Sequence, residues 1–286
     1  MFSPFIFWMW FAGLVYLAAG VIVTRKEVSD ARGLEKLIAL GRVFVATSLA
    51  VFAAEHFVDA SAIMNGVPVW MPARLLVTYF VGSCLLAAAT SLTAGQFMRF
   101  TATSLGVMFL LFVAMIHLPN VAADPRNRIL WAVALRDLAF SGGAWALAGK
   151  LTKESSPQIG KWMVLMGRLF VTMAVLFFAV EHFLHPEFAP GVPLPRMTPA
   201  WVPLHALWGY VAGAILLIAG VGLLVVNKRP RLDAASVGLL MTVLTVFLYL
   251  PMLAQGGGVP QLTESLNYVF DTLLFGGMAL LLASAL

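Results

Sequence analysis

Nine stretches of this sequence are continuously apolar, and each is about as long as a helix that crosses a bilayer. The hydrocarbon core of a bilayer is about 30 Å thick, which an α-helix of about 20 apolar residues spans. A transmembrane β-barrel would instead show segments of about ten residues in which polar and apolar residues alternate. The sequence therefore predicts an all-α integral membrane protein with about nine transmembrane helices. The predicted spans are residues 5–23, 37–57, 73–93, 99–117, 130–148, 162–183, 201–226, 234–252 and 266–286.

The composition supports a lipid environment and excludes several other classes of protein. Only 11% of the 286 residues are charged and 61% are hydrophobic, whereas about 25% of the residues in a soluble domain are charged. The single cysteine, Cys84, cannot form an internal disulfide, and the sequence has no cysteine cluster for a metal or a dithiol centre. The net charge of +5 is not gathered into a basic stripe, so we expect no nucleic-acid partner.

Lysine and arginine are unevenly divided between the predicted loops, and cytoplasmic loops are the ones that carry an excess of them. The loops after the second, fourth, sixth and eighth stretches contain only four such residues, Arg74, Arg126, Arg128 and Arg196. We therefore expect the N-terminus outside and the C-terminus in the cytoplasm of a bacterial inner membrane. The first stretch has no basic residue before it, the reverse of a cleaved signal peptide, so we expect it to remain as a helix. The basic loops follow the first, third, fifth and seventh stretches and contain Arg25, Lys26, Arg32, Lys36, Arg99, Lys150, Lys153, Lys161, Lys228, Arg229 and Arg231.

The sequence contains an internal duplication. Gly41-Arg42 and Glu55-His56-Phe57 recur as Gly167-Arg168 and Glu181-His182-Phe183, with the same internal spacing and an offset of 126. Chance rarely produces several matches in the same order, so the repeat defines the architecture. Three further matches follow at offsets of 131, 132 and 134: Trp70-Met71-Pro72 with Trp201-Val202-Pro203, Leu118-Pro119 with Leu250-Pro251, and Asp137 with Asp271.

The duplication predicts two parallel four-helix-bundle repeats and one additional N-terminal helix. We expect an N-terminal helix and basic loop over residues 1–36, a first unit over 37–150 and a second over 160–286. Each unit has four spans, so both begin and end on the same side of the membrane. Such parallel repeats are related by an axis along the membrane normal.

Each unit resembles the DoxX-like superfamily of four-helix membrane proteins. The resemblance rests on the opening Gly-Arg pairs at Gly41-Arg42 and Gly167-Arg168, on a polar pair where the first helix ends, and on a Pro-containing loop after it. It implies the fold of each unit more than any activity. Some members resemble subunits of quinone-linked redox complexes, and relatives act as membrane cargo receptors or assembly factors. The chain departs from the family's single unit by its second copy and its added helix.

Ionisable residues near the ends of the spans are the candidate site. A charged side chain in a membrane-spanning helix is costly, by about 2.5–3.5 kcal/mol on insertion scales, so it usually faces a partner or a cavity. We predict one polar pocket near the outer face of each unit. Glu55, His56, Arg74 and Asp137 are expected to line the first pocket, with His117 as a further pocket residue or a helix-exit cap. The expected residues of the second pocket are Glu181, His182, His205 and Asp271. The structural alternative is that these groups only make hydrogen bonds and ion pairs at helix ends.

Cofactor and metal signals are weak. Glu181, His182 and His185 have a spacing that can bring ligands onto one face of a helix, but Pro186 follows and the first unit has no second histidine there. We therefore expect no metal site. Two histidines at matched depth, His56 and His117, leave a haem open, and a carboxylate with a histidine leaves a quinone open. The sequence has no phosphate-binding glycine loop and no nucleophile elbow.

Three functions remain open at this point. The expected one is a binding or assembly factor, not an enzyme, that holds a small apolar ligand or another membrane protein. The second is a membrane subunit of a redox system that binds quinone or haem, and any enzymatic role would then be that of a quinone-linked oxidoreductase subunit. The third is a small-molecule transporter, although the ionisable groups gather on one side instead of spanning the membrane depth as a relay would.

Overall fold

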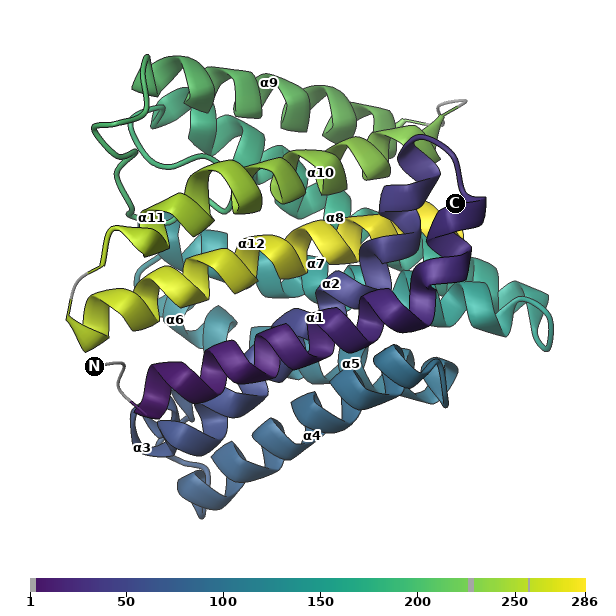
Figure 1. Ribbon diagram of the computed structural model, residues 1–286, viewed down its shortest axis with the longest axis horizontal. Coiled ribbons are helices and arrows are strands. Elements are labelled where there is room, and N and C mark those ends of the chain that lie inside the picture. Colours follow the sequence, from purple (N-terminus) through teal and green to yellow (C-terminus); the bar gives the residue numbers. More distant parts are fainter. Residues whose placement is uncertain (1–3, 226–228, 257) are drawn as a thin grey trace.

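The computed structural model describes residues 4–225, 229–256 and 258–286, and Figure 1 shows long helices that lie roughly side by side. Nine spanning elements are present in this part of the chain. Two of them are composite, because a π-helical turn interrupts each: α5 (Met98–Phe112), η2 (Val113–His117) and α6 (Leu118–Ala123), and α10 (Pro230–Leu244), η3 (Thr245–Tyr249) and α11 (Leu250–Ala254). The other seven are α1 (Pro4–Asp30), α2 (Leu34–Val58), α4 (Arg74–Ala94), α7 (Arg128–Thr152), α8 (Pro157–Leu184), α9 (His205–Leu224) and α12 (Val259–Ala285).

The prediction of an all-α integral membrane protein with about nine helices is confirmed. Eight of the spanning elements in the described ranges are long and apolar enough to cross a membrane. The ninth, α7, carries Arg136 and Asp137 in its middle. It packs against α5, α8 and α12, so protein instead of lipid surrounds much of it. Protein on several sides is the condition under which charged groups persist at membrane depth.

Several predicted boundaries were wrong by up to seven residues. The last helix begins at Val259 instead of residue 266, and the first continues to Asp30 instead of ending at residue 23. Hydropathy detects only the part of a helix inside the hydrocarbon, whereas both helices continue into the polar interface. The seventh span starts at His205 instead of residue 201, because Leu204 before it adopts a left-handed backbone conformation (φ 54°) that no helix continues through.

A central pair of helices, α7 and α12, joins the two halves. The first helix of each half packs against the last helix of the other half: α2 packs against α12, and α8 packs against α7. Glycines permit this approach: a Cβ on Gly142 would lie 2.7 Å from the carbonyl oxygen of Gly167. A similar close contact brings Gly277 against Gly41. Small residues of this kind let membrane helices pack backbone to backbone.

Local backbone geometry recurs at the offsets of the sequence motifs. The π-helical turns η2 and η3 are 132 residues apart, and each is followed by Leu-Pro. Proline lacks the N–H that would bond one turn back, which favours an irregular turn at that point. The helices α4 and α9 both begin after a residue with positive φ, Ala73 and Leu204. Two short elements, α3 (Ala60–Ile63) and η1 (Met64–Gly66), complete the loop of the first unit.

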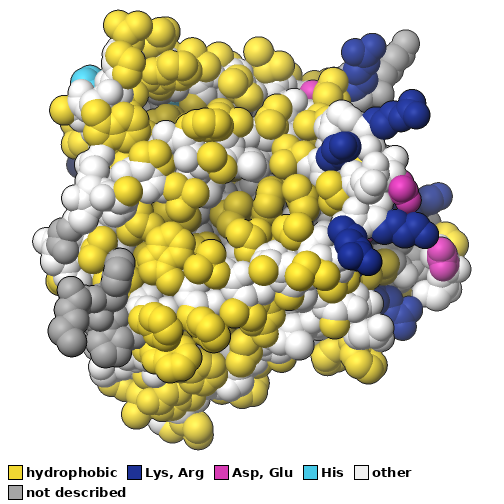
Figure 2. Space-filling model, in the orientation of Figure 1, with side chains coloured by type: hydrophobic (Ala, Val, Ile, Leu, Met, Phe, Trp, Pro, Cys, Tyr) yellow, Lys and Arg dark blue, Asp and Glu magenta, His cyan; other side chains and the backbone are white. Residues whose placement is uncertain are grey.

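Basic side chains gather at one end of the molecule, where α1, α7 and α12 end (Figures 1 and 2). This is called the basic end, and Arg231 bonds Glu35 there. The other end, where α2 and α8 end, is called the histidine end, because His56 and His182 lie in the last turns of these two helices. Between the two ends the surface in Figure 2 is largely hydrophobic. Lys228, one of the expected basic-loop residues, lies outside the described residues.

Candidate functional site

A large, mostly apolar cavity lies between α4 and α5, with a volume of about 970 Å³. It extends along α5 and η2 from Phe100 to His117, which corresponds to about 25 Å at the rise of an α-helix. Phe80 and Phe100 line it, yet these residues are 66% and 76% exposed. These two side chains therefore lie at its rim, and the cavity opens sideways onto the surface that faces lipid.

Polar groups line the end of this α4–α5 cavity that lies toward the histidine end. His117 Nε2 bonds Asp137 Oδ2 at 2.8 Å, and Arg136 Nε donates to Asp137 Oδ1 at 3.0 Å. The same guanidinium donates to Asp271 Oδ2 on α12 at 2.7 Å. Arg136 thus joins the two carboxylates that the duplication places at equivalent positions, at the contact between α7 and α12. With a neutral imidazole on His117, the group formed by His117, Asp137, Arg136 and Asp271 carries one net negative charge.

Two imidazole nitrogens on the cavity wall have no protein partner in the described part of the chain. His56 Nδ1 bonds the carbonyl oxygen of Phe52 at 2.7 Å. A carbonyl only accepts, so Nδ1 is the donor and Nε2 of the neutral ring is left as an acceptor. His117 uses Nε2 for Asp137, which leaves its Nδ1. Both histidines line the cavity, so these two nitrogens are available to a bound molecule.

The second unit fills the equivalent space with its own chain. His182, equivalent to His56, accepts a hydrogen bond on Nε2 from the backbone N–H of Gly191 at 2.9 Å. Tyr249, 132 residues after His117, donates its hydroxyl to the carbonyl oxygen of Pro190 at 2.9 Å. The segment that makes these bonds, residues 189–193, is buried.

A difference in loop length explains why only the second unit is filled. The loop between α8 and α9 has 20 residues (185–204), whereas the loop between α2 and α4 has 15 (59–73). The five additional residues are the same five by which the repeat offset grows from 126 to 131. The longer loop reaches between α8 and η3, while the shorter one only borders the α4–α5 cavity with residues such as Ile63 and Val67.

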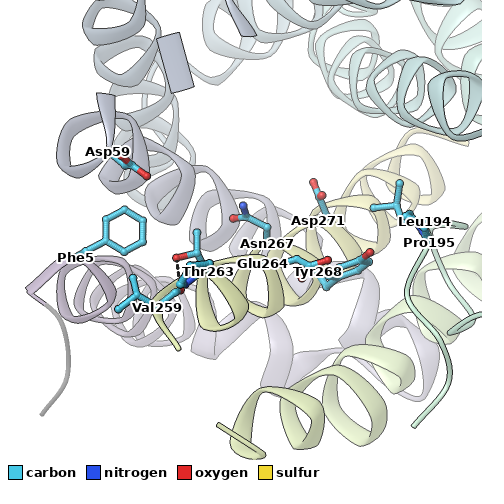
Figure 3. Close-up of a pocket in the computed structure, with 11 residues that line it drawn as sticks. Phe5, Asp59, Leu194, Pro195, Val259, Thr263, Glu264, Asn267, Tyr268 and Asp271 are labelled. Atoms are coloured by element: carbon cyan, nitrogen blue, oxygen red, sulfur yellow. Dashed lines mark hydrogen bonds between the residues drawn. The ribbon is translucent and has the colours of Figure 1, made fainter. Parts of the chain in front are cut away.

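A second cavity, of about 810 Å³, opens at the histidine end between α1, α12 and the α8–α9 loop. Figure 3 shows Asn267 and Asp271 projecting from the same face of α12 in this crevice. Asn267 donates to Glu55 Oε1 at 3.0 Å. Asp271 bonds Arg136, which lines the α4–α5 cavity, so the Arg136–Asp271 ion pair lies between the two cavities.

The predicted site residues are grouped differently from the expectation. His56, His117 and Asp137 do line one cavity, but Glu55 reaches Asn267 instead. Arg74 donates to the carbonyl oxygens of Val67 and Met64, and so it fixes its own loop instead of pairing with a carboxylate. A residue at the start of a helix is closer to the preceding loop than to the bundle interior, which explains this contact.

The second expected group is likewise divided. Glu181 pairs with Arg128 at 3.0 Å, and His182 binds the loop. His205 Nε2 bonds the carbonyl oxygen of Pro199 at 3.0 Å, a contact of the same local kind as that of Arg74. Asp271 belongs to the bridge with Arg136.

Sequence reasoning missed the central role of Arg136. Its position beside Asp137 in the middle of a span was a visible signal, because two adjacent charges in a membrane helix need partners on more than one neighbour. Arg128 gave no comparable signal, since it lies at a helix start where polar residues are common, and Asn267 gave none because it is uncharged and lies at the start of the predicted last span, 266–286.

Comparisons with protein-family models, with curated proteins and with solved structures gave no significant match. Within residues 4–225, 229–256 and 258–286, no group of three or more His, Cys, Asp and Glu side chains is arranged to hold a metal ion.

Proposed function

We propose that this is a binding protein of a bacterial inner membrane, with its N-terminus outside, that holds one amphiphilic molecule in the α4–α5 cavity. The observation that carries the proposal is the combination of an apolar cavity that opens toward lipid with two unpartnered imidazole nitrogens at one end. An apolar tail would lie along α5, and a polar head would bond His56 and His117. The volume is at the upper end of the range for small-molecule sites, about 300–1,000 Å³.

The charges favour an uncharged head. Arg136 is the arginine of the cavity wall, and it already pairs with Asp137 and Asp271. An anionic head would therefore lie close to two carboxylates, and the guanidinium that could bind it is already paired with both. A small head that donates and accepts hydrogen bonds fits the available nitrogen atoms better. The uneven distribution of basic residues supports the orientation, and the loosely matched DoxX-like motifs agree with a membrane binding or assembly role.

A second candidate is a membrane subunit of a redox system that binds a quinone in the same cavity. The observation in its favour is the Asp137–His117 pair beside apolar walls, because a carboxylate and an imidazole can hydrogen-bond the carbonyl or hydroxyl groups of a quinone ring. This candidate shares the cavity with the first and differs in the chemistry of the head.

Native mass spectrometry of the purified protein in a mild detergent tests the binding role. We expect one bound molecule of defined mass per chain, and we expect His56→Ala and His117→Ala to lose it. The matched control is His185→Ala, since His185 is a half-exposed loop residue that lines neither of the two cavities described above. An absorbance spectrum and a lipid extract of the same sample separate a quinone from other amphiphiles. A wild type with no bound molecule, or one kept equally by all three variants, contradicts the proposal.

A further inference from the structure

The filled space of the second unit shows which polar group these positions bind. The carbonyl of Pro190 and the N–H of Gly191 belong to the same peptide bond. His182 accepts from its N–H and Tyr249 donates to its C=O, so one amide group is held between the first helix of the unit and its π-helical turn. In the second unit, the group bound at this place in the fold is therefore the Pro190–Gly191 peptide group.

The first unit offers the same two contacts to a molecule from outside. His56 stands where His182 stands and has the same bond to the carbonyl one turn back, so its Nε2 is an acceptor in the same place. His117 stands where Tyr249 stands. His117 Nε2 bonds Asp137 Oδ2, so a ring with a hydrogen on each nitrogen donates through Nε2 to Asp137 and through Nδ1 to a ligand, as Tyr249 donates through its hydroxyl.

From this equivalence we infer that the α4–α5 cavity binds a secondary amide attached to an apolar tail. The inference rests on the proposed function and names the class of molecule. The amide N–H donates to His56 Nε2, the amide C=O accepts from His117 Nδ1, and the tail lies along α5 toward Phe100. A buried amide is unfavourable unless both of its groups are bonded, and here each group has a partner. An ester of the same length has no N–H and leaves His56 unsatisfied.

Two matched probes test the inference: N-methyldodecanamide, a secondary amide, and methyl dodecanoate, the corresponding ester. Binding of each to the detergent-purified, delipidated full chain is measured by native mass spectrometry titration. We expect the amide to bind one per chain and at least tenfold more tightly than the ester. His56→Ala should lower amide affinity to that of the ester and leave ester binding unchanged, while His185→Ala changes neither.

A second pair of variants tests the contact to the carbonyl. His117→Tyr introduces the donor that the second unit uses at Tyr249, so amide binding should persist, whereas His117→Phe should lose it. Thermal unfolding of both variants verifies that they fold. Equal affinities for amide and ester overturn the inference and leave the binding function intact. Loss of amide binding in both His117 variants also overturns it, and a chain that binds neither probe overturns the proposed function as well.

Discussion

Replacing Arg136 should be among the most destabilising changes in the molecule. Its guanidinium bonds Asp137 and Asp271, whose side chains are 7% and 12% exposed. In Arg136→Met, Asp137 keeps His117, but Asp271 loses its ion-pair partner at the α7–α12 contact. Removing one partner of a buried ion pair costs about 3–5 kcal/mol, because the remaining charge is left uncompensated. We therefore expect a loss of about 3–5 kcal/mol in the free energy of unfolding.

A double-mutant cycle isolates this effect. Asp271→Leu alone leaves Arg136 paired with Asp137, so it should cost less than Arg136→Met. The double variant removes the charge that the single variant strands, and it should be more stable than Arg136→Met alone. The assay is unfolding in mixed micelles with increasing SDS, followed by far-UV circular dichroism. A cost below about 1 kcal/mol for Arg136→Met, or strictly additive effects in the double variant, would refute the reasoning.

Three further predictions concern packing, the loop of the first unit and access to the cavity. Gly142→Val places a side chain against the Gly167 carbonyl and should cost about 1–3 kcal/mol in the same unfolding assay, while a change below 0.5 kcal/mol would contradict the close α7–α8 contact. Arg74→Ala removes two charged hydrogen bonds to loop carbonyls, about 1.5–3 kcal/mol each, and should make residues 59–73 cleavable by added protease before the rest of the chain. Cys84 lines the α4–α5 cavity, so an apolar maleimide should label it and bound N-methyldodecanamide should slow the labelling at least threefold. Unchanged labelling in the presence of the amide would place the bound molecule elsewhere.

The membrane fold was predictable from the sequence because the thickness of hydrocarbon fixes the length of an apolar span. The composite helix α5–η2–α6 was predicted as one span over residues 99–117, which covers α5 and η2 but ends before α6. The ends were less predictable, because polar turns such as the one around Thr263 continue a helix beyond the hydrocarbon without an apolar signal.

The candidate site was predictable as a set of residues but not as a set of contacts. His56, His117 and Asp137 were recognisable because each is an ionisable residue in or at the end of a span. Their grouping depends on which helices pack together, and the sequence did not indicate that α7 and α12 form the central pair. The bond from Arg136 to Asp271 crosses that contact. The packing of the loop over residues 185–204 was unpredictable for a related reason. The increase of five in the repeat offset shows that this loop is longer, but it does not show where the additional residues pack.

The position of a bound amphiphile along the chain tests the central claim most directly. A dodecanamide with a diazirine near the end of its tail can be photocrosslinked to the protein in liposomes and located by peptide mass spectrometry. Crosslinks should concentrate between Cys84 and Ala88 on α4 and between Phe100 and Met108 on α5, which line the far part of the cavity, and excess unlabelled amide should remove them. Crosslinks spread evenly over lipid-exposed side chains such as Phe11 on α1 and Ile218 on α9, and insensitive to competitor, would contradict a binding cavity between α4 and α5.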